Sequence, residues 1–195
     1  MQTDMEGVFR VNIICNNCVG AVLYKQKNIK FNNPFMWSLV SPNDFIYLIN
    51  NFDSLDLSKV EVTKPNKILV DSRIEVAFPH YKKADYDTPT VIGSNVFFKD
   101  ISRYMIDKWN SRLSRMDPKE SPTFVISDRK NATTNGKFWF NDLTFLSKIE
   151  TNYRVVFAGV KCDMDLPENI TFVKIASDEA PIGRIAEILI ERKIV

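Results

Sequence analysis

Two cysteines, Cys15 and Cys18, have a Cys-x-x-Cys spacing at the end of the apolar run of residues 11–15. This spacing occurs in zinc sites, in thiol redox couples and in ordinary turns between a strand and a helix. A tetrahedral zinc site needs four ligands, and the only other Cys or His residues are Cys162 and His80. A redox couple needs an exposed first cysteine, whereas Cys15 ends an apolar strand and is expected to face inward. We therefore expect no metal site here, and a turn is favoured over redox chemistry.

The residues between and after the cysteines, Asn16, Asn17 and Gly20, allow a second interpretation. In open α/β sheets, ligands bind beyond the carboxyl ends of the strands, where the first βα turn presents backbone N–H groups. Asparagine tolerates left-handed backbone and could hydrogen-bond a sugar or a phosphate, and glycine allows a close approach. The alternative is a plain Asn-Asn turn, which composition alone favours.

A basic face is expected on the helix predicted over residues 99–116. Lys108, Arg112 and Arg115 are spaced by four and three residues, so they share one side of this helix beside Trp109. Like charges at i and i+4 cost roughly a few tenths of a kcal/mol, so a solvated face ordinarily mixes signs. Three cations together therefore indicate an anionic partner, such as a phosphate held by Arg forks. A solvated face that pairs with acids from elsewhere is an equal alternative.

Two loops that follow predicted strands carry further polar residues. His80 and Tyr81 come after the predicted strand region of residues 67–78, and Asp128 comes directly after residues 123–127. Binding and catalytic residues concentrate on such loops, and His is the side chain with an unperturbed pKa near neutrality. His80 is thus a candidate general base, and Tyr81 and Asp128 are candidates for substrate binding. A lone His is nevertheless more often structural than catalytic.

Sequence motifs identify no nucleotide site or cofactor. The chain contains no Gly-rich dinucleotide fingerprint, no P-loop, no nucleophile elbow and no zinc-protease motif. Asp163 and Asp165 form a D-x-D of the kind that some glycosyltransferases use to hold a metal-bound sugar nucleotide. So short a motif also arises by chance, and an ordinary loop explains it equally well.

The elements that would position these residues alternate along the chain. Strands are predicted at residues 8–15, 59–63, 67–78, 123–127, 153–159 and 170–176, and helices at 19–25, 41–52, 99–116, 141–149 and 181–194. The alternation from residue 123 onward predicts crossovers and a mostly parallel or mixed sheet with helices on both faces, in a Rossmann-like three-layer α/β architecture. We expect a single α/β domain over residues 1–195, in which residues 151–195 continue the sheet and add a C-terminal helix.

Composition and charge exclude several classes of protein. The 195 residues are 45% hydrophobic and 26% charged, which are the values of a globular chain. The net charge of +2 disfavours a nucleic-acid partner. No apolar run is long enough to span a bilayer, and residues 1–10 lack the features of a signal peptide, so we expect a cytoplasmic location. Peripheral membrane contact through the basic C-terminal ERKIV remains an alternative, and the sequence does not indicate an oligomeric state.

Several of these segments together resemble one protein family. NNCVGAVLYK, SPNDFIYLINN, PHY and KWNSRLSRM occur in this order in the DUF1919 family, and the resemblance covers residues 8–150. The recurring positions of the family correspond here to Asn16, Asn17, Cys18, Gly20, Pro42, His80, Tyr81, Lys108, Trp109, Arg112 and Arg115. Cys15 departs from the small hydroxyl residue expected of relatives, which supports the interpretation of the cysteine pair as a turn.

The resemblance implies an α/β fold and an association with bacterial exopolysaccharide or capsule biosynthesis. One hypothesis is therefore a glycosyltransferase-like enzyme that binds a phosphorylated or nucleotide-linked sugar. In it Lys108, Arg112 and Arg115 would hold phosphate, Asn16 and Asn17 would hold the sugar, and His80 would be the general base. A second hypothesis is acyl transfer with Cys18 as nucleophile and His80 as base. A third is a non-catalytic module that binds a carbohydrate or an acidic partner.

Overall fold

The computed structural model describes residues 12–64, 66–79, 90–92, 95–97, 101–128, 143–177 and 180–194. Four α-helices lie in these ranges: α1 (Val19–Gln26), α2 (Pro42–Asn51), α4 (Ile101–Leu113) and α5 (Ile182–Glu191). Two 3-10 helices are η1 (Phe52–Ser54) and η3 (Thr144–Lys148). The strands are β1 (Ile13–Cys15), β2 (Leu39–Val40), β3 (Val60–Lys64), β4 (Lys67–Val70), β5 (Ile74–Ala77), β6 (Thr90–Ile92), β7 (Asn95–Phe97), β8 (Thr123–Ser127), β9 (Arg154–Gly159) and β10 (Ile170–Lys174).

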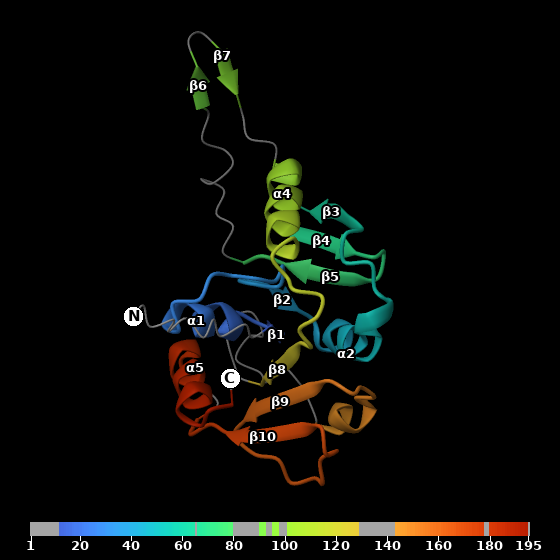
Figure 1. The fold of residues 1–195 in the computed structure, drawn as a ribbon, viewed down its shortest axis with the longest axis vertical. Coiled ribbons are helices and arrows are strands. Elements are labelled where there is room, and N and C mark those ends of the chain that lie inside the picture. Colours follow the sequence, from blue (N-terminus) through green and yellow to red (C-terminus); the bar gives the residue numbers. More distant parts are fainter. Residues whose placement is uncertain are drawn as a thin grey trace, which may run out of the picture.

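A four-stranded parallel sheet has the order β1-β8-β9-β10 (Figure 1). Its strands are continuous apolar runs, and β8 and β9 are buried along most of their length. Such runs are typical of strands that are covered on both faces. Because the strands are parallel, the residues that follow β1, β8 and β9 meet at one edge of the sheet, which we call the carboxyl edge. The opposite edge, where these strands begin, is the amino edge.

A second, antiparallel sheet has the order β2-β5-β4-β3. The strands β4 and β5 form a hairpin, in which Arg73 N donates to Val70 O at 3.0 Å. Asp71 and Ser72 between them have φ of 48° and 56°. Positive φ at both central residues is the signature of a type I′ turn, whose twist matches that of the flanking strands. Residues 67–78, which the sequence predicts as one strand region, are thus two strands joined by this turn.

The two sheets meet where β1 ends. The backbone N–H of Val40, in β2, donates to Asn16 O at 3.0 Å, so β2 lies beside the end of β1. Figure 1 shows β2 and β8 on opposite sides of β1. The chain leaves β1 through α1 towards β2, whereas it leaves β8 towards β9, on the other side. The connections after β1 and β8 therefore diverge, which is the arrangement called a topological switch point.

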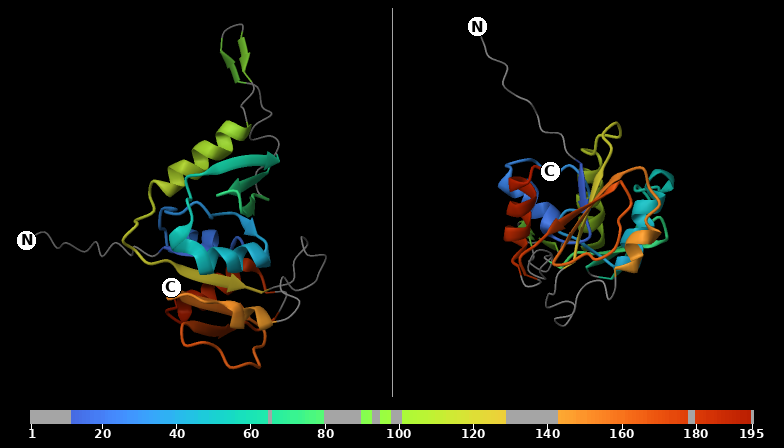
Figure 2. Two further views of the ribbon diagram at one scale, coloured as in Figure 1. Left: turned by 90° about the vertical axis from the view of Figure 1, so that its right-hand side faces the viewer. Right: turned by 90° about the horizontal axis from the view of Figure 1, so that it is seen from below.

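The parallel sheet is covered on both faces (Figure 2). On one face, side chains of α1 and α5 pack on Ile13, Cys15 and Val125. On the other face, Ile14, Phe124 and Phe157 form a larger core with α2, η3, α4 and the antiparallel sheet, to which Trp109 also belongs. The alternation of side chains along β1 thus divides the interior into two cores.

These observations confirm the coarse prediction and leave the fine one unconfirmed. The fold is mixed α/β, with a parallel sheet, a separate antiparallel sheet and four α-helices among the described residues. A Rossmann-like three-layer architecture is not confirmed, because β3, β4 and β5 pair as neighbouring antiparallel strands in a sheet of their own. Of the predicted helices, α2 has the expected start, with the Ser41 side chain accepting from Asp44 N.

Candidate functional site

At the carboxyl edge, two asparagines after β1 bind the backbone of Ser127 at the end of β8. Asn16 Oδ1 accepts from Ser127 N at 2.9 Å, and the side-chain amides of Asn16 and Asn17 both donate to Ser127 O, at 3.3 and 3.2 Å. Asn17 Oδ1 accepts from Val19 N at 3.0 Å, which caps the first turn of α1. Both asparagines are almost fully buried. They fix the separation of β1 and β8 at the switch point.

Beside these amides lie two polar side chains on the other strand, Ser127 and Asp128. Ser127 is 0% exposed, and its Oγ hydrogen-bonds to no residue that the structure describes. Asp128 is 6% exposed and its backbone N–H donates to Ala158 O at 3.0 Å. Burying a hydroxyl without a partner costs free energy, so most buried polar groups are paired. Ser127 Oγ therefore differs from the asparagines, whose polar atoms bind the backbone.

The cysteine pair forms part of the turn at this edge. Cys15 and Cys18 are 2% and 3% exposed. Burial raises the pKa of the Cys18 thiol to about 11 and raises that of Cys15 further. Gly20 packs directly on Cys15, because a Cβ added to Gly20 would lie 2.9 Å from Cys15 Sγ. Both thiols are therefore protonated at neutral pH, and they pack the joint between β1 and α1.

The predicted basic face of α4 holds a loop instead of facing outward. Arg112 is 5% exposed, its Nη1 donates to Met36 O at 2.6 Å, and its guanidinium lies 5.9 Å from the centre of the Phe31 ring. Arg115 Nε donates to Phe31 O at 2.7 Å. Lys108 Nζ donates to the hydroxyl of Tyr104, one turn earlier on the same helix. The two arginines thus bind carbonyl groups of the segment between α1 and β2.

Trp109, on the same helix, is a core residue. It is 1% exposed, its ring meets those of Phe35 and Phe78 edge to face, and its Nε1 donates to Leu57 O at 2.8 Å. Trp109 therefore belongs to the buried side of this helix. As a possible substrate contact it stays a prediction.

The loop that Arg112 binds contains a strained residue, Trp37, whose φ is 59°. Left-handed backbone at a bulky residue costs about 1–3 kcal/mol and persists only where the surroundings hold it. The Phe31 ring lies edge to face on Trp37, and Arg112 binds the carbonyl just before it.

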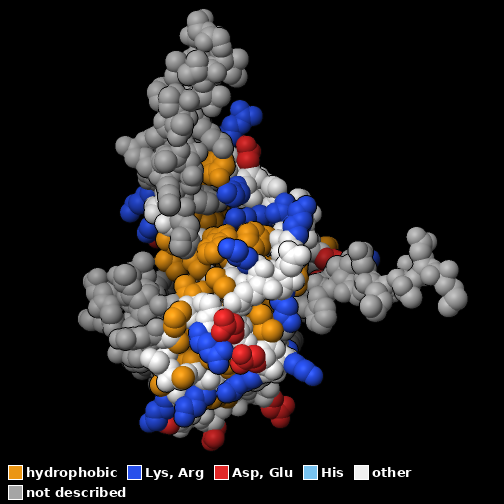
Figure 3. Space-filling view, turned by 90° about the vertical axis from the view of Figure 1, so that its left-hand side faces the viewer, with side chains coloured by type: hydrophobic (Ala, Val, Ile, Leu, Met, Phe, Trp, Pro, Cys, Tyr) orange, Lys and Arg blue, Asp and Glu red, His pale blue; other side chains and the backbone are white. Residues whose placement is uncertain are grey.

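On the face that carries α1, hydrophobic side chains gather at mid-height with Lys and Arg around them (Figure 3).

The structure brings together only part of the predicted site. Asn16, Asn17, Cys18, Gly20 and Asp128 meet at the carboxyl edge. Trp109, Arg112 and Arg115 do not join them, because α4 ends at Leu113 and leads to the start of β8 at the amino edge (Figure 2, left). His80 and Tyr81 lie outside the described residues, so the roles predicted for them stay predictions. Asp163 is exposed and pairs with Lys161, as an ordinary loop residue does.

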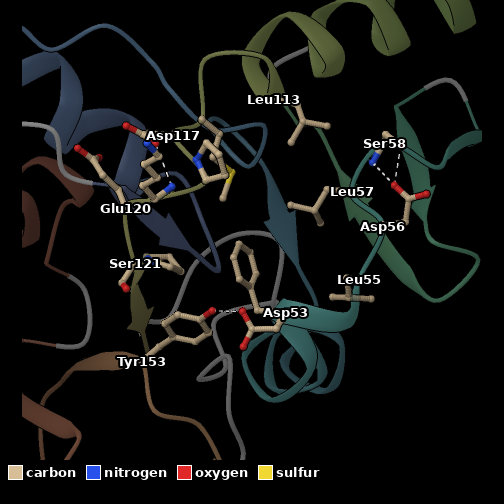
Figure 4. Close-up of a pocket in the computed structure, with 15 residues that line it drawn as sticks. Asp53, Leu55, Asp56, Leu57, Ser58, Leu113, Asp117, Glu120, Ser121 and Tyr153 are labelled. Carbon is tan, nitrogen blue, oxygen red and sulfur yellow. Dashed lines mark hydrogen bonds between the residues drawn. The ribbon is translucent and has the colours of Figure 1, made fainter.

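Sequence reasoning missed a cavity of about 510 Å³ at the amino edge (Figure 4). Its lining comes from three distant segments, namely residues 52–58, residues 113–122 and Tyr153. Leu55, Leu57, Leu113 and Met116 supply apolar walls, and Asp53, Asp56, Asp117 and Glu120 supply carboxylates. Asp117-Pro118 was interpretable in the sequence only as the end of a helix, so no local signal indicates this cavity.

One wall of this cavity is a pair formed by Asp53 and Tyr153. The hydroxyl of Tyr153 donates to Asp53 Oδ1. Partial burial and the neighbouring carboxylate raise the pKa of Tyr153 to about 12. Asp56 Oδ1, at the opposite side, accepts from the backbone and the hydroxyl of Ser58, and these bonds lower its pKa. The carboxylates of Asp53 and Asp56 are thus held in place at neutral pH.

The sequence of this chain matches that of known proteins over most of its length. A profile of DUF1919, described as a domain of unknown function, matches residues 8–158, well over half of the chain. The chain belongs to the DUF1919 family. The resemblance based on the Asn-Cys turn and the α4 motif is therefore confirmed. The match ends within β9, so β10 and α5 lie beyond it.

A protein of similar sequence occurs in Haemophilus influenzae, where it is an uncharacterized protein. The two sequences are 25% identical over 142 residues, which is 71% of this chain and 60% of that protein. This chain therefore spans less than two thirds of the length of that relative.

Two features are absent from the described residues, a cluster of metal ligands and a membrane-spanning helix. In the ranges that the structure covers, no group of three or more His, Cys, Asp or Glu residues could hold a metal ion. Across the same ranges, no helix has both the length and the apolar character needed to cross a bilayer.

Proposed function

We propose that this DUF1919 protein binds a phosphorylated or nucleotide-linked sugar at its carboxyl edge and acts as a glycosyltransferase-like transferase. The reaction would serve the assembly of a surface polysaccharide, because the family resemblance implies an association with that process. The proposal rests on the polar residues at the switch point between β1 and β8, where ligands of open α/β sheets bind.

The observation that carries the proposal is the buried hydroxyl of Ser127. All four polar side chains at this edge are less than 7% exposed, but the amides of Asn16 and Asn17 bind protein backbone. Ser127 Oγ binds no described residue, and an unpaired buried hydroxyl lowers stability. A ligand hydroxyl or phosphate oxygen that reached it would remove this cost, so the group supports a binding role.

Each residue then has a distinct task. Asn16 and Asn17 are positioning residues, because they hold the Ser127 backbone against β1. Ser127 and Asp128 would contact the sugar, with Asp128 accepting from its hydroxyls. His80 would be the general base. It would take the proton from the hydroxyl of the acceptor as that oxygen bonds to the sugar and the bond between the sugar and its phosphate breaks. Tyr81 would contribute to substrate binding beside it.

The phosphate role predicted for Lys108, Arg112 and Arg115 receives less support. Arg112 and Arg115 donate to carbonyl groups of residues 31 and 36, and these bonds hold a loop. The phosphate role stays a prediction, and variants of these residues belong in the binding experiment.

Acyl transfer through Cys18 is not part of the proposal. A nucleophilic cysteine needs a lowered pKa and access to substrate. Cys18 is 3% exposed, and burial raises its pKa to about 11. At neutral pH its thiol carries its proton and faces the protein interior.

The test is a thermal-shift screen of the full chain against nucleotides, nucleotide sugars and sugar phosphates. A ligand at one hundred times its dissociation constant stabilises a protein by about 2.7 kcal/mol, which is readily seen as a rise in Tm. The decisive variant is Ser127→Ala. Because it removes a buried hydroxyl that has no partner among the described residues, it should leave the Tm of the free protein unchanged or raise it.

Under the proposal, Ser127→Ala and Asp128→Asn abolish the shift given by a nucleotide sugar or a sugar phosphate. Ser102→Ala, on α4, provides a matched loss of one hydroxyl away from this edge. If none of these compounds shifts the Tm of the natural sequence, or if Ser127→Ala retains the whole shift, the proposal is overturned and a non-catalytic module takes its place.

A further inference from the structure

We propose that the cavity at the amino edge is a second binding site, whose ligand is an aliphatic ammonium group. This chemistry is shared by free polyamines and by lysine side chains of a peptide. The cavity lies at the edge opposite Asn16 and Ser127, and nothing in the proposed transferase reaction requires it.

The size and the walls of the cavity suit a flexible chain of methylene groups. Its volume of about 510 Å³ is within the range of sites for small molecules. Leu57 comes from the loop before β3, and Leu113 and Met116 come from the end of α4. The close-up shows Leu57 and Leu113 on the same side of the cavity, away from the Asp53–Tyr153 pair (Figure 4). One region is thus apolar and another polar, as a ligand with an apolar body and a polar end requires.

The charge of the lining selects a cation. Asp53, Asp56, Asp117 and Glu120 contribute four carboxylates, and Lys119 contributes the only ammonium group among the lining residues. A concave surface lined by one sign of charge raises the local concentration of ions of the opposite sign. Phosphates and nucleotide sugars would be repelled by the same lining, so this site differs in ligand class from the carboxyl edge.

The carboxylates are ordered before a ligand arrives. Asp53 is held by the hydroxyl of Tyr153, Asp56 by Ser58, and Asp117 Oδ1 by the backbone N–H of Lys119 at 2.9 Å. An ionised carboxylate has about four acceptor positions, so one local donor leaves acceptor capacity on Asp53 for an ammonium group. Preorganised acceptors reduce the entropy that binding must overcome.

A second cavity, of about 300 Å³, extends this surface. It shares Phe52, Asp53 and Tyr153 with the first, and it adds Glu150. No Lys or Arg lines it. Carboxylates are therefore present on both sides of the Asp53–Tyr153 pair, which matches a chain with more than one ammonium group.

An ammonium group fits this lining better than a bare metal ion. Over the described ranges, the structure contains no group of three or more side chains arranged to hold a metal. A metal ion also gains nothing from Leu57, Leu113 and Met116, whereas the methylene groups of an amine bury apolar surface there.

The test is isothermal titration calorimetry of the full chain with cadaverine, with a trilysine peptide and with pentanediol as the neutral analogue of cadaverine. We expect saturable binding of at least one cation, weakened by added salt, and none of pentanediol. Tighter binding of cadaverine identifies a free amine as the ligand, and tighter binding of trilysine identifies a peptide. Saturable binding of neither cation overturns the proposal.

Variants locate the binding. Asp53→Asn with Glu120→Gln removes two lining charges and keeps the shapes of the side chains, so affinity should fall about tenfold. Glu187→Gln is the matched control, and it should leave affinity unchanged. Glu187 lies on α5, which covers the same face of the parallel sheet as α1. Equal effects of the control and of the lining variants would place the binding elsewhere and overturn the proposal. Ser127→Ala should not alter cation binding, so this test and that of the transferase fail independently.

Discussion

The two edges of the parallel sheet use polar residues in opposite ways. At the carboxyl edge, the amides of Asn16 and Asn17 are buried and bind the backbone of Ser127. At the amino edge, Asp53 and Asp56 are exposed and line a cavity, and each is held by a local donor. The first arrangement holds the fold together, and the second leaves charge available to a ligand.

This difference teaches that polar residues at the expected edge of an α/β sheet are not all ligands. A buried amide has both donors and acceptors, so it can satisfy a neighbouring strand end completely. A carboxylate only accepts, and it is costly to bury, so it remains near solvent. In this protein the amides of Asn16 and Asn17 become framework, and the carboxylates of Asp53 and Asp56 remain accessible. Asp128, a carboxylate that is 6% exposed, does not follow this division.

The sharpest test of the contrast is a pair of substitutions, Asn16→Ala and Asp53→Asn. Asn16→Ala leaves the buried N–H of Ser127 without its acceptor, so the free energy of unfolding should fall by about 3 kcal/mol. Asp53→Asn retains an acceptor for Tyr153 at an exposed position, and its effect should stay below about 0.5 kcal/mol. Urea unfolding measures both. Similar losses for the two would remove the distinction between framework and accessible groups.

The basic residues of α4 extend the comparison to a third region. Arg112→Met leaves Met36 O without its donor in a buried setting, and stability should fall by about 2 kcal/mol. Arg115→Met should cost about 1 kcal/mol, because its side chain is less buried. Lys108→Met is the control, since its bond to Tyr104 is within the helix. Unchanged unfolding curves for all three would favour a purely anion-binding role.

The packing of the cysteine turn predicts a smaller effect. Gly20→Ala in an open helix should stabilise by up to about 1 kcal/mol. Here the new Cβ would meet Cys15 Sγ, so we expect a loss of about 1–2 kcal/mol instead. Cys15→Ala removes that sulfur, and the double variant should lose less than the sum of the single ones. Additive losses in thermal unfolding would show that the contact does not limit this position.

The smallest expected effect concerns Tyr153 and alkaline pH. Its pKa is raised in the folded state to about 12, above the ordinary value of 10.0. Between these values the unfolded chain loses the proton first, so the contribution of Tyr153 is complete below pH 10 and is lost as pH rises towards 12. Tyr153→Phe should therefore show a shallower fall in stability over this window. Parallel stability curves for the two proteins would contradict the role of the Asp53–Tyr153 pair.

Local patterns in the sequence were sufficient for most of the elements. The helix predicted over residues 41–52 begins with Ser41, Pro42 and Asp44, a local signal because a cap and a rigid first residue act within one turn. The apolar runs at residues 123–127, 153–159 and 170–176 predicted strands of the parallel sheet. The separate antiparallel sheet was not predicted, since the partner of a strand depends on residues far along the chain.

The candidate site divides in the same way. The Asn-Cys turn was expected at a strand end, and it lies there, because a strand end is a local feature. The basic side of α4 was also predicted from the sequence, but its hydrogen-bond partners were not. The carbonyls of Phe31 and Met36 come close to it only after folding. The cavity joins residues 52–58, 113–122 and 153, and no pattern within one segment indicates such a meeting.

The sequence by itself determined the α/β class, the family and the positions of turns and caps, all of which arise from interactions between near neighbours. The tertiary structure alone decided that Asn16 and Arg112 bind backbone and that Asp53 faces a cavity. The physical reason is that a polar group either bonds to protein atoms or stays accessible to solvent and ligands. Which of the two occurs depends on the distant atoms that come within hydrogen-bond distance of it. That distance is set by the packing of whole elements, and it is not contained in the spacing of residues along the chain.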